Sequence, residues 1–342
     1  MSEPPFRDRP AAPAPVEPGG RAPTPSVPDV PAAAQPPVQP PVAQPPVGQP
    51  PVGQQPAQPS VTSHGRAGRN LPAAIAVGVG AGAYIVLSLI FAPWAFVGLI
   101  AVALLLGTRE MSNALAKIGM NAAIVPIMVG TIAISIGSYL AGLQRPPVFS
   151  TTSVLLASLA LTVLAALIWR MPKGAHGYVK DASASLMIIG YVPLLGSFSA
   201  LILAGENGPL RIVTFLLIVV MGDTGGYVAG VLFGKHPMAP KISPKKTWEG
   251  FAGSVVFAVV AGVLMTVFGL GEAFWVGIVL GVCLVAIGTC GDLIESLIKR
   301  DLGIKDMSSF LPGHGGVMDR LDSLLVAAPI AWLIMYLLVP GG

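Results

Sequence analysis

The run SLIKRDLGIKDMSSFLPGHGGVMDRLD, from Ser296 to Asp322, lies between two apolar segments, 273–297 and 323–340. Each flanking segment is close to the roughly 20 apolar residues that a helix needs to cross a hydrocarbon core of about 30 Å. The run itself is rich in Lys, Arg, Asp and Gly. The run therefore places cations, which can bind phosphate, beside carboxylates, which can bind metals, at a membrane surface. This pattern indicates chemistry between a charged soluble substrate and a lipid.

The composition of the whole chain supports a membrane protein. Of its 342 residues, 53% are hydrophobic and 11% are charged, whereas globular proteins contain about 25% charged residues. Nine apolar segments follow one another: 71–91, 94–111, 121–141, 151–169, 184–204, 210–233, 251–269, 273–297 and 323–340. We predict an all-α polytopic membrane protein with about nine transmembrane helices. The first two segments, separated by Ala92 and Pro93, form either a helical hairpin or one kinked element.

Residues 1–70 differ in composition from the rest of the chain. Twenty of the 34 prolines lie in the first 60 residues. Such a segment buries too little apolar surface to offset its ordering entropy, so we predict a disordered, Pro-rich cytoplasmic tail. The remainder divides into N-terminal transmembrane helices, 71–205, and a C-terminal catalytic transmembrane region, 206–342.

The distribution of Lys and Arg predicts the topology. If the tail is cytoplasmic and all nine segments span the membrane, the cytoplasmic loops hold 13 cations, whereas the outer loops hold only Arg145 and Arg211. The positive-inside rule then places the N-terminus and the charged loops in the cytoplasm and the C-terminus outside the cell membrane. The formal charge of +4 could suggest nucleic acid, but this distribution of the cations points instead to membrane topology and anionic phosphates. The sequence contains no groove pattern that combines aromatic and basic residues, so it does not predict nucleic-acid binding.

A polar helix face precedes the charged run. Four residues follow the i, i+3, i+4, i+7 spacing of one face: Asp292, Glu295, Ser296 and Lys299. A charge that faces lipid at the bilayer centre costs about 2.5–3.5 kcal/mol, so this face is expected to line a polar cavity at the cytoplasmic end of its helix. The alternative is an intramembrane salt bridge between Lys299 and one of the two carboxylates.

The motif PGHGGVMDRLD carries the second group of candidate residues. Gly315 and Gly316 leave the backbone bare, so that its N–H groups can approach phosphate oxygens. Asp319 and Asp322 are spaced i, i+3 where the last helix begins. Carboxylates with open positions suit Mg²⁺, which keeps waters and is completed by substrate phosphates. His314 is either a phosphate ligand or proton-transfer group, or simply a polar loop residue.

Two further motifs lie upstream. In KISPKKTWEG, Ser243 followed by Pro244 predicts a helix N-cap with proline at the first helical position. That helix would direct its N-terminus, with Lys245 and Lys246, at an anion. Alternatively, the two lysines only satisfy the positive-inside rule. In GDTGGYVAG, the glycines at i+4 spacing indicate close helix packing. Asp223 is an intramembrane carboxylate, which predicts a function as a ligand or as support for a lysine.

In this order, the motifs resemble the signature of the phosphatidate cytidylyltransferases (CDP-diacylglycerol synthases). The signature residues are S-x-[LI]-K-R at 296–300, K-D at 305–306 and P-x-H-G-G-x-x-D-R-x-D at 312–322. The motifs GDTGGYVAG, FGK and ISPKKTWEG also resemble that family. The resemblance is strong over 220–325, extends back to residue 71 and does not cover the Pro-rich tail.

The resemblance implies a membrane enzyme that joins CTP to phosphatidic acid, giving CDP-diacylglycerol and pyrophosphate, and it implies a homodimer. It also implies Mg²⁺, with a second, monovalent cation such as K⁺, held by Asp292 and Asp319; Asp322 is a further candidate ligand. The candidate catalytic residues are Asp292, Asp319, Lys299, Arg300 and His314. The candidate substrate-binding residues are Ser243, Lys245, Lys246, Lys305, Gly315, Gly316, Arg320 and Asp223.

Two other functions are open at this point. A CTP-dependent kinase of a polyprenol or another lipid would use an equally cationic site, but it would release CDP and not pyrophosphate. A cation- or proton-coupled transporter would use Asp223 and Asp292 as a relay. Transport sites usually lie at the midplane between repeats, and the chain has no internal repeat.

Overall fold

The computed structural model describes residues 71–143, 149–308, 310 and 315–340. All of them belong to one compact unit of the chain, Ser63–Gly342. Side chains are described from Gly78 onward. The predicted tail and the candidate residue His314 lie outside the described residues.

The helices reproduce the predicted apolar segments. In chain order they are α1 (Leu71–Phe91), α2 (Pro93–Ala116), α3 (Ile124–Ile132), a π-helical turn (Ala133–Gly137), α4 (Ser138–Leu143), α5 (Thr151–Arg170), a 3₁₀ turn (Met171–Lys173), α6 (Tyr178–Ile189), a π-helical turn (Gly190–Leu194), α7 (Leu195–Ala204), α8 (Gly208–Phe233), α9 (Trp248–Leu264), a π-helical turn (Met265–Leu270), α10 (Phe274–Asp301) and α11 (Met318–Leu338). Eight helices of the described chain are long and apolar enough to cross a membrane, and Gly78–Phe91 is a shorter apolar helix. The all-α polytopic membrane class is therefore confirmed.

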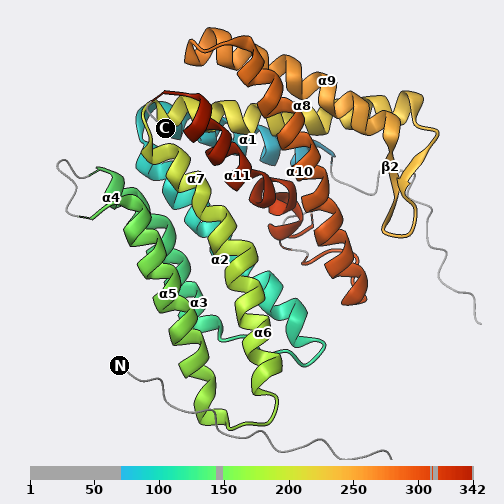
Figure 1. Cartoon of the computed structure of the whole chain (residues 1–342). Coiled ribbons are helices and arrows are strands. Elements are labelled where there is room, and N and C mark those ends of the chain that lie inside the picture. The colour runs from blue at the N-terminus through green and yellow to red at the C-terminus, as the bar shows by residue number, and fades with distance from the viewer. Residues whose placement is uncertain (1–70, 144–148, 309, 311–314, 341–342) are drawn as a thin grey trace, which may run out of the picture. The chain divides into compact units, whose positions relative to one another are not determined.

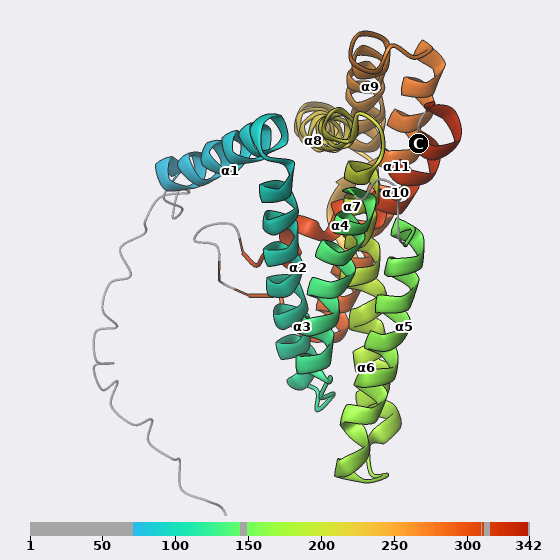
Figure 2. The same ribbon diagram turned by 90° about the vertical axis from the view of Figure 1, so that its left-hand side faces the viewer.

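The first two apolar segments are separate helices. Ala92 has φ −152° and ψ 73°, outside the helical region, and Pro93 begins α2. A residue before proline is driven out of the α region by the proline ring, which explains the break at this position. As a result, α1 turns sharply away from α2 (Figure 2).

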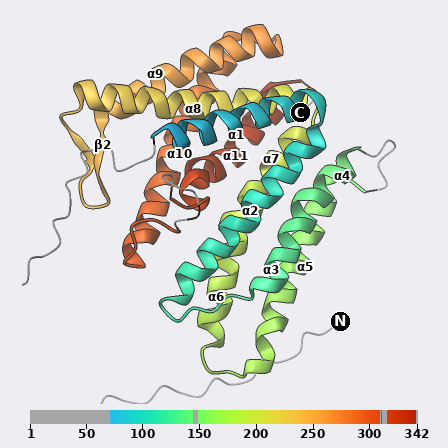
Figure 3. The same cartoon turned by 180° about the vertical axis from the view of Figure 1, so that it is seen from behind.

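Two groups of helices position the site. Helices α2, α3, α5 and α6 lie side by side, and α8 runs across their direction (Figures 1 and 3). Helix α9 packs closely on α8 because glycines form the contact: a Cβ atom added to Gly253 would lie 2.3 Å from Cβ of Ala229 and 2.7 Å from the carbonyl oxygen of Gly225. The α8 glycines at i+4 spacing pack on Gly250 of α9, where an added Cβ atom would lie 3.1 Å from the carbonyl oxygen of Gly226 and 3.4 Å from Cα of Gly230. The close packing that the sequence predicts for them is therefore confirmed.

A short hairpin interrupts the helical pattern between α8 and α9. Strands β1 (Pro237–Ala239) and β2 (Ser243–Thr247) pair antiparallel. The predicted N-cap at Ser243 is therefore wrong, because Ser243 begins a strand. Helix α9 starts at Trp248, and the hydroxyl of Thr247 caps it by accepting a hydrogen bond from the Gly250 N–H at 3.1 Å.

The core joins the two halves of the chain. One hydrophobic cluster contains Phe96 of α2 together with Phe215 of α8 and Leu280 of α10. A second contains Met111 of α2 together with Met318 of α11. Both clusters bury residues from before and after position 205, so helices from both halves hold α10 and α11 in place. The division of functions between 71–205 and 206–342 stays a prediction.

Candidate active site

Two adjoining cavities lie where α8, α10 and α11 meet. The first, with a volume of about 370 Å³, is called the charged cavity, and it is lined by Asp223, Lys246, Asp292, Glu295, Ser296, Lys299, Asp319, Arg320, Asp322 and Ser323. The second, of about 240 Å³, extends between α8, α9, α10 and β2 and is called the glycine-lined cavity, since its wall includes Gly222, Gly226, Gly230, Gly250 and Gly288. Four residues line both cavities: Asp223, Lys246, Asp292 and Ser323. The two cavities therefore share one wall of polar side chains.

The polar face of α10 lines the charged cavity as the sequence predicts. All four residues of this face contribute to the cavity wall: Asp292, Glu295, Ser296 and Lys299. The alternative salt bridge is present as well, because Lys299 pairs with Glu295 one turn before it. A polar cavity and an intrahelical ion pair therefore coexist on this face.

Glu295 is buried and incompletely paired. Its side chain is 1% exposed. Within the described part of the chain, its Oε1 atom has no hydrogen-bond partner. Leaving a buried polar group unsatisfied costs about 1–3 kcal/mol, and more when the group is charged. This oxygen marks a position in the charged cavity where a bound cation or donor would lower the free energy.

Asp319 joins three parts of the site. Its Oδ1 atom lies 2.9 Å from Nζ of Lys299, and its Oδ2 atom accepts hydrogen bonds from the N–H groups of Gly316 at 2.7 Å and Met307 at 3.1 Å. Gly315 has a φ of +81°, and a Cβ atom there would lie 2.9 Å from Oδ2 of Asp319. A glycine is therefore required in this turn by its conformation. The Gly316 N–H group is bonded within the turn itself.

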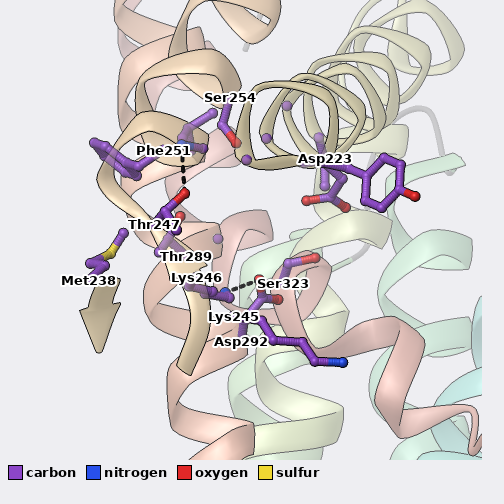
Figure 4. Close-up of a pocket in the computed structure, with 18 of the residues that line it drawn as sticks. Asp223, Met238, Lys245, Lys246, Thr247, Phe251, Ser254, Thr289, Asp292 and Ser323 are labelled. Atoms are coloured by element: carbon purple, nitrogen blue, oxygen red, sulfur yellow. Dashed lines mark hydrogen bonds and ion pairs between the residues drawn. The ribbon is translucent and has the colours of Figure 1, made fainter. Parts of the chain in front are cut away.

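The hairpin supplies lysines from the opposite side. Lys246 of β2 forms an ion pair with Asp292 of α10, and Asp223 extends from α8 across the cavity (Figure 4). Lys245 lines the glycine-lined cavity.

At the base of the hairpin, the carboxylate of Glu249 accepts hydrogen bonds from the N–H groups of Lys235 at 3.1 Å and His236 at 3.2 Å. This contact fixes the start of the hairpin to the first turn of α9.

Five of the predicted site residues that the structure describes are not brought into the cavities. Neither the charged cavity nor the glycine-lined cavity is lined by Ser243, Arg300, Lys305, Gly315 or Gly316. Arg300 and Lys305 are exposed. The site that the structure assembles is thus smaller than the predicted set.

The carboxylates fit a hard cation that is only partly coordinated by protein. In the described ranges, no group of three or more His, Cys, Asp or Glu side chains is close enough to hold a metal ion. The predicted ligands Asp292 and Asp319 face Lys246 and Lys299 instead. However, the potential donors are carboxylate oxygens around a cavity large enough for water and phosphate. Mg²⁺ usually takes one or two carboxylates and completes its shell with waters and substrate phosphates, so the donor set fits this ion.

Sequence reasoning missed Glu110. This buried residue of α2 accepts hydrogen bonds from the N–H groups of Val317 at 3.0 Å and Met318 at 2.8 Å. The available signal was a carboxylate inside an apolar segment, the criterion that singled out Asp223. Glu110 lines neither cavity but touches the segment that carries Asp319.

Comparison with known proteins assigns the family. Residues 72–338 match the model of the cytidylyltransferase family. The chain belongs to this family. It is 42% identical to the phosphatidate cytidylyltransferase of Mycobacterium leprae over 289 residues, which cover 80% of this chain and 90% of that protein. It is 41% identical to the protein of the same name from Mycobacterium bovis, with 82% of this chain and 93% of that protein covered.

A more distant relative covers a shorter part of the chain. The phosphatidate cytidylyltransferase of Staphylococcus saprophyticus is 38% identical over 156 residues, which cover 45% of this chain and 59% of that protein. The family match includes α2 to α11 and thus every described residue that lines the two cavities.

Proposed function

We propose that the chain is a phosphatidate cytidylyltransferase, which transfers the cytidylyl group of CTP to phosphatidic acid and releases pyrophosphate. The observation that carries this proposal is the charged cavity, in which lysines from β2 and α10 face carboxylates at the ends of membrane-spanning helices. A site of this kind gives a soluble triphosphate and a membrane lipid access to the same cations. Identity of about 40% to relatives that carry the enzyme's name supports the same conclusion.

The reaction requires no nucleophile from the protein. An oxygen of the phosphatidate phosphate attacks the α-phosphorus of CTP and forms the new P–O bond. The bond from that phosphorus to the bridging oxygen breaks, and pyrophosphate leaves with the electron pair. Phosphatidate is already an anion at neutral pH, so no covalent enzyme intermediate is needed. Such a transfer depends mainly on positioning and on neutralisation of phosphate charge.

Lys246 and Lys299 are the cations best placed for this role. Each already contacts a carboxylate of the charged cavity, which holds its ammonium group in a defined position. A phosphate that enters the cavity would exchange partners with these carboxylates. Arg320 lines the same cavity, and Lys245 lines the adjoining one, where we place the remainder of the nucleotide.

Mg²⁺ is part of the proposal, with Asp292, Asp319 and Asp322 as its candidate ligands. All three line the charged cavity, the first from α10 and the others from the start of α11. When bound, the ion supplies charge neutralisation on phosphate oxygens. A second, monovalent cation such as K⁺ is proposed beside it on the family resemblance.

The chain is a multi-pass membrane protein, with eight candidate spans among the residues that the structure describes. We propose that it lies in the cell membrane with its N-terminus and charged cavity on the cytoplasmic side and its C-terminus outside. Termini on opposite sides need an odd number of spans, so the proposal counts α1, with its 21 residues, as a ninth. The support is the distribution of loop cations, of which 13 fall on one side and two on the other. A homodimer is proposed on the family resemblance alone.

The test is an assay of the full chain in detergent micelles that contain phosphatidic acid and CTP, with and without Mg²⁺. The intact chain is compared with Asp319→Asn and with Glu206→Gln, which alters an exposed loop residue between α7 and α8. We expect CDP-diacylglycerol and pyrophosphate in equal amounts, dependent on Mg²⁺, retained in Glu206→Gln and lost in Asp319→Asn. Release of CDP with a phosphorylated lipid would identify a lipid kinase, and no turnover in any condition would contradict the proposal.

A further inference from the structure

Glu110 of α2 lies against the start of α11, 207 residues away in the sequence. The residue is 7% exposed. Its Oε1 atom accepts hydrogen bonds from the Val317 N–H at 3.0 Å and from the Ser308 hydroxyl at 2.6 Å. Its Oε2 atom accepts one from the Met318 N–H at 2.8 Å. Both oxygens of this buried carboxylate are therefore bonded to one short stretch of chain.

These hydrogen bonds replace a local helix cap. The residue at the N-cap of α11 is Val317, whose side chain cannot cap a helix. The first N–H groups of a helix have no partner within the helix, and the positive end of its dipole favours a carboxylate. Glu110 supplies both the acceptors and the charge. A different helix thus provides the cap of α11.

The stretch that Glu110 holds leads directly into the charged cavity. A Cβ atom on Gly316 would lie 2.6 Å from Oε2 of Glu110 and 3.1 Å from Oδ2 of Asp319, so the two carboxylates flank this glycine. Asp319 follows in the first turn of α11 and lines the cavity with Arg320. The direction of both side chains depends on how this turn is fixed.

We propose that Glu110 is a positioning residue for the reaction. By accepting hydrogen bonds from Ser308, Val317 and Met318, it fixes the first turn of α11 and thereby directs Asp319 and Arg320 into the charged cavity. The inference rests on the proposed function. Glu110 lines neither cavity, so it acts through these residues and does not itself contact the substrates.

Glu110→Gln is the informative substitution. It keeps the size of the side chain and one acceptor oxygen, but it replaces the other oxygen with an amide that cannot accept from an N–H group. Displacement of a supporting residue of this kind typically lowers activity about 10- to 100-fold. We expect a fall of this size in kcat with a smaller change in KM for phosphatidic acid and CTP. Glu110→Asp, which keeps the charge, should recover part of the loss.

The experiment compares the full chain with Glu110→Gln, Glu110→Asp and Glu206→Gln in micelles. It measures kcat and KM for both substrates, the thermal unfolding midpoint, and hydrogen exchange of the backbone amides of residues 315–325. We expect faster exchange of these amides and a lower kcat in Glu110→Gln, with neither change in Glu206→Gln. A Glu110→Gln variant with the original kcat and the original exchange would overturn the inference.

Three further outcomes separate this inference from others. If Glu110→Gln has a lower unfolding midpoint but the original kcat for its folded fraction, Glu110 is only structural and the inference fails. If Glu110→Gln does not fold, the comparison passes to Glu110→Asp, in which an unchanged kcat overturns the inference and a lower kcat at an unchanged midpoint supports it. If the intact chain makes no CDP-diacylglycerol, the proposed function fails, and exchange at 315–325 still decides whether Glu110 holds this turn.

Discussion

The Nζ atom of Lys299 lies 2.9 Å from Oδ1 of Asp319, which joins α10 to α11 inside the charged cavity. The same ammonium group pairs with Glu295, and the same carboxylate accepts the N–H groups of Gly316 and Met307. One lysine thus connects a polar helix face, a glycine turn and the loop between the two helices. Its removal should affect both folding and chemistry.

Lys299→Ala should destabilise the protein and inactivate it. The substitution leaves Glu295 and Asp319 without their shared cation, and breaking a buried ion pair costs about 3–5 kcal/mol. Thermal unfolding in detergent should show a clear fall in midpoint, together with loss of product formation. Lys117→Ala, at an exposed position after α2, is the matched control and should change neither quantity. An unchanged midpoint for Lys299→Ala would mean that the pair contributes nothing to the fold.

Lys246→Ala should reduce turnover more than stability. Lys246 is on the hairpin and pairs with Asp292 across the cavity, where we propose that it meets a phosphate. Loss of one preorganised donor to a developing charge typically lowers kcat about 10²- to 10³-fold. Lys241→Ala removes an exposed lysine between β1 and β2 and should leave kcat unchanged. Equal effects of the two substitutions would place the phosphates elsewhere.

Thr247→Ala should lower the stability of the protein by about 1 kcal/mol, because its hydroxyl caps α9. Thr247→Ser keeps the hydroxyl, so its stability should be close to that of the original chain. Ser243→Ala alters a strand residue and should have no capping effect. The measurement is the unfolding midpoint of each variant in the same detergent. A larger loss for Ser243→Ala than for Thr247→Ala would restore Ser243 as the cap.

Gly253→Ala should separate α8 from α9. The new methyl group would lie 2.3 Å from Cβ of Ala229 and 2.7 Å from a backbone oxygen of Gly225, and overpacking of this kind costs about 1–3 kcal/mol. Gly98→Ala in α2 is the control, because no atom lies within 4 Å of its new methyl group. Alanine is the better helix former, so this control should be neutral or stabilising by up to about 1 kcal/mol. An equal fall in the unfolding midpoints of Gly253→Ala and Gly98→Ala would argue against close packing at Gly253.

Local patterns predicted the helices and one wall of the site. The length of each apolar segment determines whether it can cross a membrane, and the spacing from Asp292 to Lys299 determines that both lie on one helix face. These properties belong to a single helix, so they can be deduced without knowing its neighbours. The same applies to the glycines of α8, whose spacing indicates a close contact before the partner is known.

Contacts between distant segments could not be predicted in this way. Ser243 followed by Pro244 is a local signal that is compatible with a helix start and with an edge strand, and the pairing of β2 with β1 decided between them. Glu110 and Val317 are 207 residues apart in the sequence, and no periodic pattern indicates that they are in contact. The partner of Lys246 likewise depends on where the hairpin folds back. In each case the missing information was the identity of the neighbour.

The charged cavity is lined by five carboxylates and only three cations. Both proposed substrates are polyanions, so Lys246 and Lys299 would have to leave their carboxylate partners in order to bind phosphate oxygens. A cation that arrives with the nucleotide would then give those carboxylates a new partner. Nucleotide and cation would in this way stabilise each other's binding in the charged cavity.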